Sequence, residues 1–118
     1  MSLYIVEKVV DGVLLLDLRG QITLGDETEA LRSKIKEVVA AGYTRILLDL
    51  EEITYIDSVG LSTLVASFTS TRSAGGNLKL LHLPRGVHHL LQITRLSTVF
   101  EIYDNLEAAR QSFEQPST

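Results

Sequence analysis

The sequence predicts an α/β fold: a single domain with a mixed, mostly parallel five-stranded sheet, an opening β-hairpin and about four helices. Three observations predict it. Asp11-Gly12 joins two segments rich in Val, Ile and Leu, as a tight hairpin turn does. Segments with helical spacing then alternate with short apolar runs, which favours right-handed parallel crossovers. The chain has 118 residues, 45% of them hydrophobic, which suffices for one domain with a buried core.

The first half of the chain is expected to form the hairpin, a helix and a central strand. Residues 3–10 and 13–19 are the hairpin strands, and the polar residues 20–26 are expected to form a loop. A helix follows, which Gly42 ends in a left-handed conformation. Its apolar side chains recur at i, i+4, i+7 and i+8: Leu31, Ile35, Val38 and Val39. Residues 45–50 are an almost unbroken apolar run, typical of a strand covered on both faces.

The second half is expected to supply three more helices and two more strands. Residues 51–57 form a connection, and residues 58–73 form a helix that Gly75-Gly76 ends. Residues 78–83 form a strand, Pro84 permits the start of a short helix, and residues 99–103 form the last strand. The apolar stripe of the long helix is Leu61, Leu64, Val65 and Phe68, and that of the short one is Val87, Leu90 and Leu91. Asp104 is expected to cap a final helix that buries Leu106, Ala109 and Phe113, so the domain covers residues 1–113 and a polar tail covers residues 114–118.

Composition excludes several functional classes. Eleven Lys and Arg against fifteen Asp and Glu give a net charge of −4, so we expect no nucleic-acid partner. The absence of cysteine excludes disulfides, zinc-thiolate sites and thiol nucleophiles. No apolar run approaches the length of a membrane span, so we expect no membrane insertion and a cytoplasmic location. An exposed hairpin strand leaves a monomer or a weak dimer open.

Functional groups in such sheets lie in loops beyond the carboxyl ends of the strands, here residues 20–26, 51–57 and 83–85. Asp57-Ser58 falls where one of these loops becomes a helix. Either side chain can cap the helix by accepting a free backbone N–H. Ser58 can also be a phosphorylation site, because the amides and positive dipole end of a helix accommodate an anion.

The chain resembles the STAS domains, and within them the bacterial anti-sigma factor antagonists. The most specific part of the resemblance is Asp57-Ser58-x-Gly60-Leu61 after a buried strand. It extends to the following segments: Asp11-Gly12, Leu18-Arg19-Gly20, residues 45–50, Gly75-Gly76-Asn77-Leu78 and residues 96–100. The resemblance implies a STAS-like fold and phosphorylation of Ser58 by a serine kinase that is also the anti-sigma factor. It implies no cofactor and no enzymatic activity.

Two positions depart from the family pattern. The family usually has a second Ser or Thr where this chain has Val59. It usually has an acidic residue three positions after the glycine, where this chain has Thr23; Asp26 follows three residues later in what is expected to be a longer loop. The second departure bears on how a nucleotide-loaded kinase engages the chain.

One stripe of the long helix is predicted to be a docking face. It consists of small, uncharged residues at i, i+3, i+4 and i+7: Thr63, Ala66, Ser67 and Ser70. Small side chains let another backbone approach closely at little entropic cost, although a merely solvated face would look the same. The resemblance then implies a cycle. The unphosphorylated chain captures the anti-sigma factor, the kinase releases it by phosphorylating Ser58, and a serine phosphatase resets the chain.

Alternative functions can be considered for the same residues. A STAS scaffold or subunit of a stress-sensing or lipid-transport complex, without a phosphoswitch, is the alternative. A hydrolase nucleophile requires glycine two positions before the serine, where Ile56 stands. The histidines His82, His88 and His89 lack metal-ligand spacing, and Asp49 lacks the acidic pair and the lysine of a phosphoacceptor site.

Overall fold

The computed structural model describes residues 2–114 as one α/β domain. It contains five strands, four α-helices and one short 3₁₀ helix. In chain order they are β1 (Leu3–Val10), β2 (Val13–Ile22), α1 (Asp26–Ala40), β3 (Arg45–Ile56), α2 (Ser58–Ser73), β4 (Asn77–Leu81), α3 (Arg85–Ile93), η1 (Leu96–Thr98), β5 (Ile102–Tyr103) and α4 (Leu106–Ser112). Of the predicted tail, residues 115–118 lie outside the described part.

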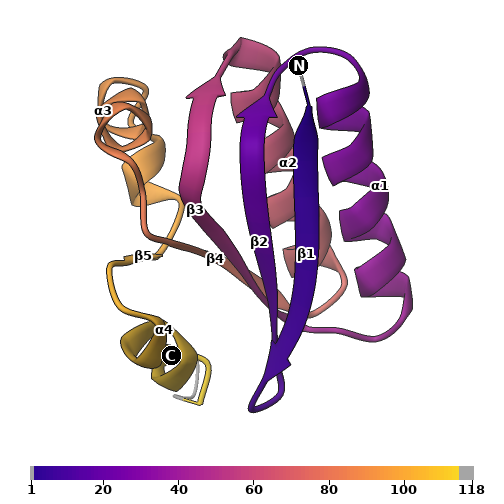
Figure 1. Ribbon diagram of the computed structural model, residues 1–118. Coiled ribbons are helices and arrows are strands. Elements are labelled where there is room, and N and C mark those ends of the chain that lie inside the picture. Colours follow the sequence, from indigo (N-terminus) through magenta and orange to yellow (C-terminus); the bar gives the residue numbers. More distant parts are fainter. Residues whose placement is uncertain (1, 115–118) are drawn as a thin grey trace.

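The sheet has the strand order β1-β2-β3-β4-β5 (Figure 1). The β1 and β2 strands are antiparallel, and every other pair is parallel. The hairpin turn at Asp11 and Gly12 has φ angles of 50° and 81°, the left-handed values that a tight two-residue hairpin turn requires. The predicted mixed five-stranded sheet with an opening hairpin is confirmed.

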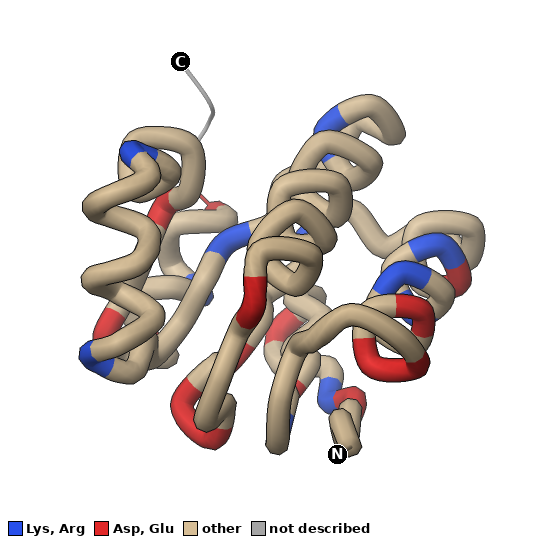
Figure 2. The backbone as a smooth tube through the Cα atoms, turned by 90° about the horizontal axis from the view of Figure 1, so that it is seen from above, with Lys and Arg blue, Asp and Glu red and all other residues tan. Residues whose placement is uncertain are grey.

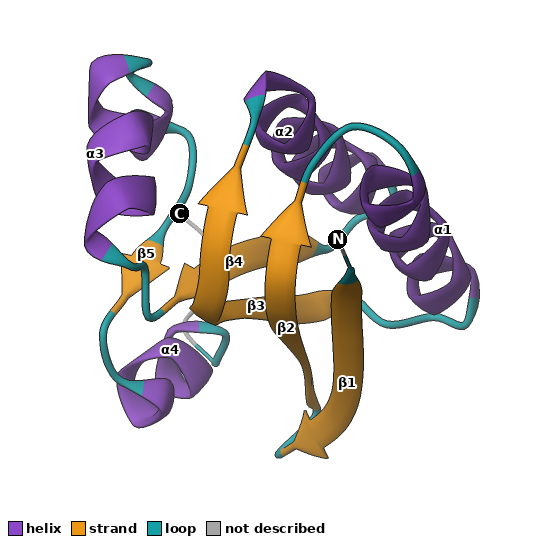
Figure 3. Ribbon diagram, turned by 45° about the horizontal axis from the view of Figure 1, so that its top comes forward, coloured by secondary structure: helices purple, strands orange, loops and turns teal. Residues whose placement is uncertain are grey.

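Helices cover both faces of this sheet (Figures 1 and 3). Alternate residues of β2 face opposite ways, as side chains on a strand do. Leu14, Leu16 and Leu18 belong to the larger core cluster, to which α1, α2 and α3 contribute. Val13 and Leu15 belong to a smaller cluster with residues of α4. Gly42 ends the turn after α1 with a φ of 98°, as predicted.

The β2 and β3 strands are longer than predicted: residues 20–22 of the expected loop 20–26 and residues 51–56 of the expected connection 51–57 are strand. The β2 strand runs to Ile22 and β3 runs to Ile56. Two register shifts between these strands interrupt the alternation of apolar and polar residues. Ile53 and Ile56 are buried while Thr54 and Tyr55 between them are exposed, and such a pattern does not look like a strand in the sequence.

The C-terminal elements also differ in detail from the prediction. The last strand covers only Ile102–Tyr103, and η1 precedes it. Asn105 caps α4, because its side-chain oxygen accepts the N–H of Ala108 at 2.9 Å; the predicted cap, Asp104, was wrong. Ala109 and Phe113 are buried as predicted, whereas Leu106 is 36% exposed.

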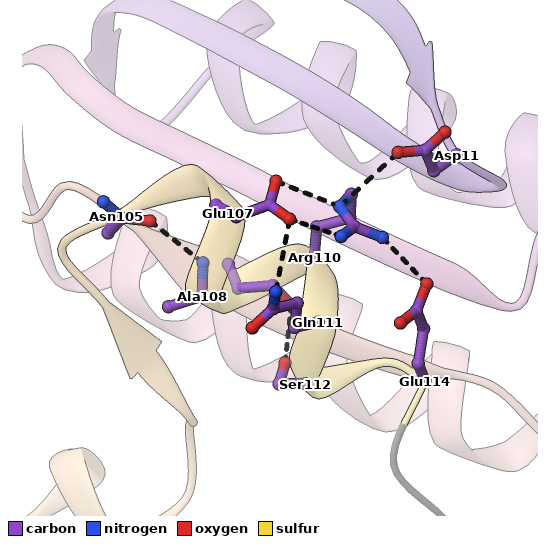
Figure 4. A network of polar contacts seen from close by, with 9 residues as sticks. Asp11, Asn105, Glu107, Ala108, Arg110, Gln111, Ser112 and Glu114 are labelled. Carbon is purple, nitrogen blue, oxygen red and sulfur yellow. Dashed lines mark hydrogen bonds and ion pairs between the residues drawn. The ribbon is translucent and has the colours of Figure 1, made fainter.

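Polar contacts hold α4 against the sheet. Figure 4 shows Arg110 of α4 between Glu107, Glu114 and the hairpin residue Asp11. The Nη1 atom of Arg110 is 2.8 Å from Glu114 Oε1, and its Nε atom is 3.5 Å from Asp11 Oδ2. The helix at the end of the chain is therefore tied to the turn at its beginning.

Candidate functional site

The candidate site lies where β3 passes into α2. Asp57 is the N-cap of α2 and Ser58 is the first residue of the helix. The Asp57 carboxylate accepts the N–H of Gly60 at 2.7 Å through Oδ1 and that of Leu24 at 2.8 Å through Oδ2. Asp57, and not Ser58, is therefore the cap of α2. The Ser58 side chain is left exposed at the start of the helix.

Asp57 is a stable anion beside the Ser58 hydroxyl. The N–H of Leu24, followed by that of Gly60, holds the pKa of this carboxyl below its ordinary value. The first turn of α1 adds Asp26, Glu27 and Glu29. Figure 2 shows these acidic residues gathered at the start of α1, at the end of the molecule where α2 also begins. A further negative charge on Ser58 would therefore enter a region that is already acidic.

The start of α2 is packed tightly against the end of β2. The Asp57 N–H donates to the Ile22 carbonyl at 3.3 Å. A Cβ atom at Gly60 would lie only 1.9 Å from the same carbonyl oxygen, so this helix position has no room for a side chain. The fixed backbone gives Ser58 a defined position at the surface.

The residues that depart from the family pattern lie around this helix start. The loop between β2 and α1 contains only residues 23–25, and Asp26 is the first residue of α1; the expected longer loop was wrong. Thr23 is half-buried and Asp26 is exposed. Val59 is half-buried, and its carbonyl accepts the Thr63 hydroxyl at 2.8 Å.

The predicted docking face was wrong for two of its four residues. Thr63 is 0% and Ser67 is 3% exposed. Each hydroxyl donates to the carbonyl four residues earlier in α2, Thr63 to Val59 and Ser67 to Thr63, both at 2.8 Å. With their polar atoms satisfied inside the helix, these small side chains can be buried.

The small residues of α2 lie beside another helix of the same chain, α1. Ala66, Ser67 and Ser70 line a shallow hollow together with Arg32, Ile35 and Lys36 of α1. The stripe was predicted to face a partner protein, whereas in the structure α1 lies beside part of it. Ala66 stays half-buried and Ser70 exposed at the margin of this contact.

Two exposed apolar residues beside the site were missed. Leu24 is 72% exposed in the loop whose N–H binds Asp57, and Tyr55 is 56% exposed near the end of β3. Leu24 lies in a three-residue loop next to Gly25. An apolar residue in such a loop is the feature of the sequence that could have indicated its exposure. We call the surface made by Leu24, Asp57 and Ser58 the switch surface.

Residues that could have belonged to a metal site or a phosphoacceptor site instead make contacts within the fold. The Nδ1 atom of His82 lies 3.3 Å from Asp49 Oδ1, a pairing that was not predicted from the sequence. Lys79 lies in β4, is 4% exposed and reaches Ser112 and Glu101 with its Nζ atom. Within residues 2–114, no group of three His, Asp or Glu side chains is placed to hold a metal ion.

Comparison with known proteins gives a consistent family. The sequence model of the STAS domain matches residues 4–109. The candidate anti-sigma factor antagonist BtrV of Bordetella bronchiseptica is 29% identical over 105 residues, which cover 89% of this chain and 90% of that protein. The anti-sigma-B factor antagonist of Bacillus subtilis is 31% identical over 81 residues, which cover 69% of this chain and 73% of that one. Both relatives are named as antagonists of anti-sigma factors.

The fold has a close match among solved structures. The crystal structure of a candidate anti-sigma factor antagonist from Thermotoga maritima superposes with a TM-score of 0.87 at 25% identity and covers 94% of this chain and 95% of that one. Among the described residues, no helix combines the length and the apolar character needed to cross a bilayer.

Proposed function

The chain belongs to the STAS domain family, and from this premise we propose that it is an anti-sigma factor antagonist whose partner-binding surface carries Ser58 as a phosphorylation switch. The unphosphorylated chain binds an anti-sigma factor through the switch surface and through Ala66 and Ser70, which lie further along α2. The partner is also the serine kinase that modifies Ser58, and a serine phosphatase reverses the modification.

The observation that supports the switch most directly is the exposed hydroxyl of Ser58 beside the ionised Asp57. A kinase can reach an exposed hydroxyl at a helix start without unfolding the domain. Phosphorylation adds roughly −1.5 to −2 charges, and here it adds them next to a carboxylate whose lowered pKa keeps it charged. The modification therefore changes the charge of the surface while the core stays as it is.

The effect on binding follows from desolvation. A partner that covers the switch surface buries an unmodified serine as a small hydroxyl. A phosphoserine must find cationic groups on the partner or lose its hydration. A penalty of about 2.7 kcal/mol already weakens binding about 100-fold.

Phosphorylation and binding can be tested with two serines on the same helix. The chain, its Ser58→Ala variant and its Ser62→Ala variant are each incubated with ATP and the serine-kinase anti-sigma factors of the source organism, and phosphate is mapped by mass spectrometry. Ser62 is the matched control, because it is exposed one turn further along α2. We expect labelling of the wild type and of Ser62→Ala at Ser58, and none of Ser58→Ala.

Binding completes the test. Calorimetric titration should give tight binding for the wild type and for Ser58→Ala, and binding about 100-fold weaker for Ser58→Glu or the phosphorylated chain. Labelling elsewhere, or equal affinity with and without phosphate, would contradict the switch. Absence of labelling with every kinase would favour a STAS scaffold in which Ser58 has only a structural role.

A further inference from the structure

We propose that the groove between the second half of β3 and helix α3 binds an extended segment of the anti-sigma factor, which pairs with the free edge of β3 as an added strand. This inference rests on the proposed function, because it identifies a second part of the same partner's binding surface. It concerns residues outside the switch surface.

The first observation is an unpaired strand edge. The β4 strand pairs with β3 only along residues 45–49. Beyond them β3 continues to Ile56 and, within residues 2–114, its described ladder partners are all in β2. Figure 1 shows α3, rather than a strand, beside this upper half of β3. Backbone N–H and C=O groups on a free edge are a template for another strand.

The second observation is a groove along that edge. Its volume is ≈ 450 Å³, and its floor and walls are mostly apolar. The walls include Tyr55 and Ile56 of β3 and Gly86, Val87, Leu90 and Ile93 of α3. Tyr55 is 56% and Ile93 is 63% exposed, so large apolar surfaces border an open space.

Together the edge and the groove specify an extended ligand. An added strand satisfies the free backbone groups and points alternate side chains toward the helix, which is how peptides bind between a strand and a helix by strand addition. Six residues of β3 span about 20 Å and the nine residues of α3 about 13 Å, which accommodates four to six residues of an extended segment. The segment should be apolar at alternate positions.

Charge beside the groove specifies one end of the segment. An adjoining hollow shares Pro84 with the groove and is lined by Glu51, Asp104, His82 and Leu83. Two carboxylates there fit a Lys or Arg that follows or precedes the apolar residues. At the other end, Ile56 of the groove directly precedes Asp57 and Ser58. The groove therefore ends next to the switch surface along the chain, so one partner can cover both.

Gly86 offers a test that blocks the groove without disturbing the fold. A Cβ at Gly86 meets nothing within 4 Å, and glycine is a poor helix residue, so Gly86→Leu should fill the groove without lowering the melting temperature. Gln92→Leu is the matched control, because Gln92 is exposed on the same helix and does not line the groove. We expect Gly86→Leu to weaken binding of the purified anti-sigma factor by about 10-fold or more and Gln92→Leu to leave it unchanged.

Hydrogen exchange measures the added strand itself. In the complex, those amides of residues 52–56 that face away from β2 should exchange more slowly than in the free chain; the Glu51 N–H already donates to Asp49 Oδ1. Unchanged affinity of Gly86→Leu, or unchanged exchange of these amides in a complex that Ser58→Glu abolishes, would contradict binding in the groove but not the phosphorylation switch. Failure of the wild type to bind any anti-sigma factor would instead overturn the proposed function.

Discussion

The Asp57 carboxylate accepts the backbone N–H of Leu24 at 2.8 Å, although the two residues are 33 positions apart in the sequence. Through its other oxygen the same carboxylate caps α2 at Gly60. One side chain therefore joins the loop after β2 to the beginning of the helix that carries Ser58. This side chain therefore helps to fix the position of the Ser58 hydroxyl.

Replacing Asp57 should make stability less dependent on pH in the acid range. Its folded-state pKa lies below its ordinary value near 4, because backbone N–H groups bind the charged form. The stabilisation is therefore present above about pH 4 and is lost as the pH falls through the folded-state pKa. Asp57→Asn should be less stable than the wild type at pH 7, and the difference should shrink by pH 3. Urea unfolding at pH 7 and at pH 3 measures this difference in the free energy of unfolding.

A suitable control for the loss of the cap is Asp26→Asn. Asp26 is exposed at the start of α1, and the N-cap of α1 is Gly25, so this substitution removes no cap. At pH 7, Asp26→Asn should lower the free energy of unfolding less than Asp57→Asn, because the Asp57 carboxylate accepts two backbone N–H groups. If the difference in free energy of unfolding between Asp57→Asn and the wild type stays constant from pH 7 to pH 3, the charge of the cap does not contribute to stability.

Gly60→Ala should destabilise the domain at the switch. The added Cβ would meet the Ile22 carbonyl oxygen at 1.9 Å, so the start of α2 must move away from β2. Overpacking of this kind costs about 1–3 kcal/mol. Gly86→Ala is the control, because its Cβ has open space and should gain about 0.5–1 kcal/mol from helix propensity. Equal unfolding midpoints of Gly60→Ala and the wild type in urea would refute the close approach.

Much of the fold and part of the site could be predicted from the sequence. A helix cap at Asp57 or Ser58, the hairpin at Asp11 and the stop at Gly42 follow from local backbone requirements, and the structure identifies Asp57 as the cap. Local patterns could not show that β3 continues to Ile56, because two register shifts break its alternation. They also could not show the partner of the small-residue stripe, since α1 and α2 meet only through the tertiary fold.

The burial of Ser67 between α2 and α1 can be tested by substitution. Ser67 is 3% exposed and faces α1, so Ser67→Arg must place a charged side chain between two packed helices. We expect a loss of several kcal/mol in the free energy of unfolding, on the order of 3 kcal/mol. Ser70→Arg is the control one turn later, where the side chain is exposed and the change should be within about 0.5 kcal/mol. Similar melting temperatures for the two variants would contradict the burial of Ser67.

Lys79 allows the contribution of a buried cation to be separated from that of its aliphatic stem. Its Nζ atom lies 2.9 Å from Ser112 Oγ and 3.3 Å from Glu101 Oε1, and 4.5 Å from the centroid of the Phe113 ring. The side chain is almost fully buried under α4. Lys79→Ala removes stem and charge and should cost about 2–3 kcal/mol.

Lys79→Met should recover most of that loss, because it keeps the unbranched stem and the partners of the ammonium group retain other contacts. The Ser112 hydroxyl also donates to the Ala109 carbonyl at 2.6 Å, and Glu101, which is half-exposed, also accepts the Tyr103 hydroxyl. Replacing a buried charge by an apolar side chain of similar volume is often close to neutral. Urea unfolding should therefore place Lys79→Met within about 1.5 kcal/mol of the wild type. A loss as large as that of Lys79→Ala would show that the ammonium group, through Phe113 and Glu101, is what holds α4 on the sheet.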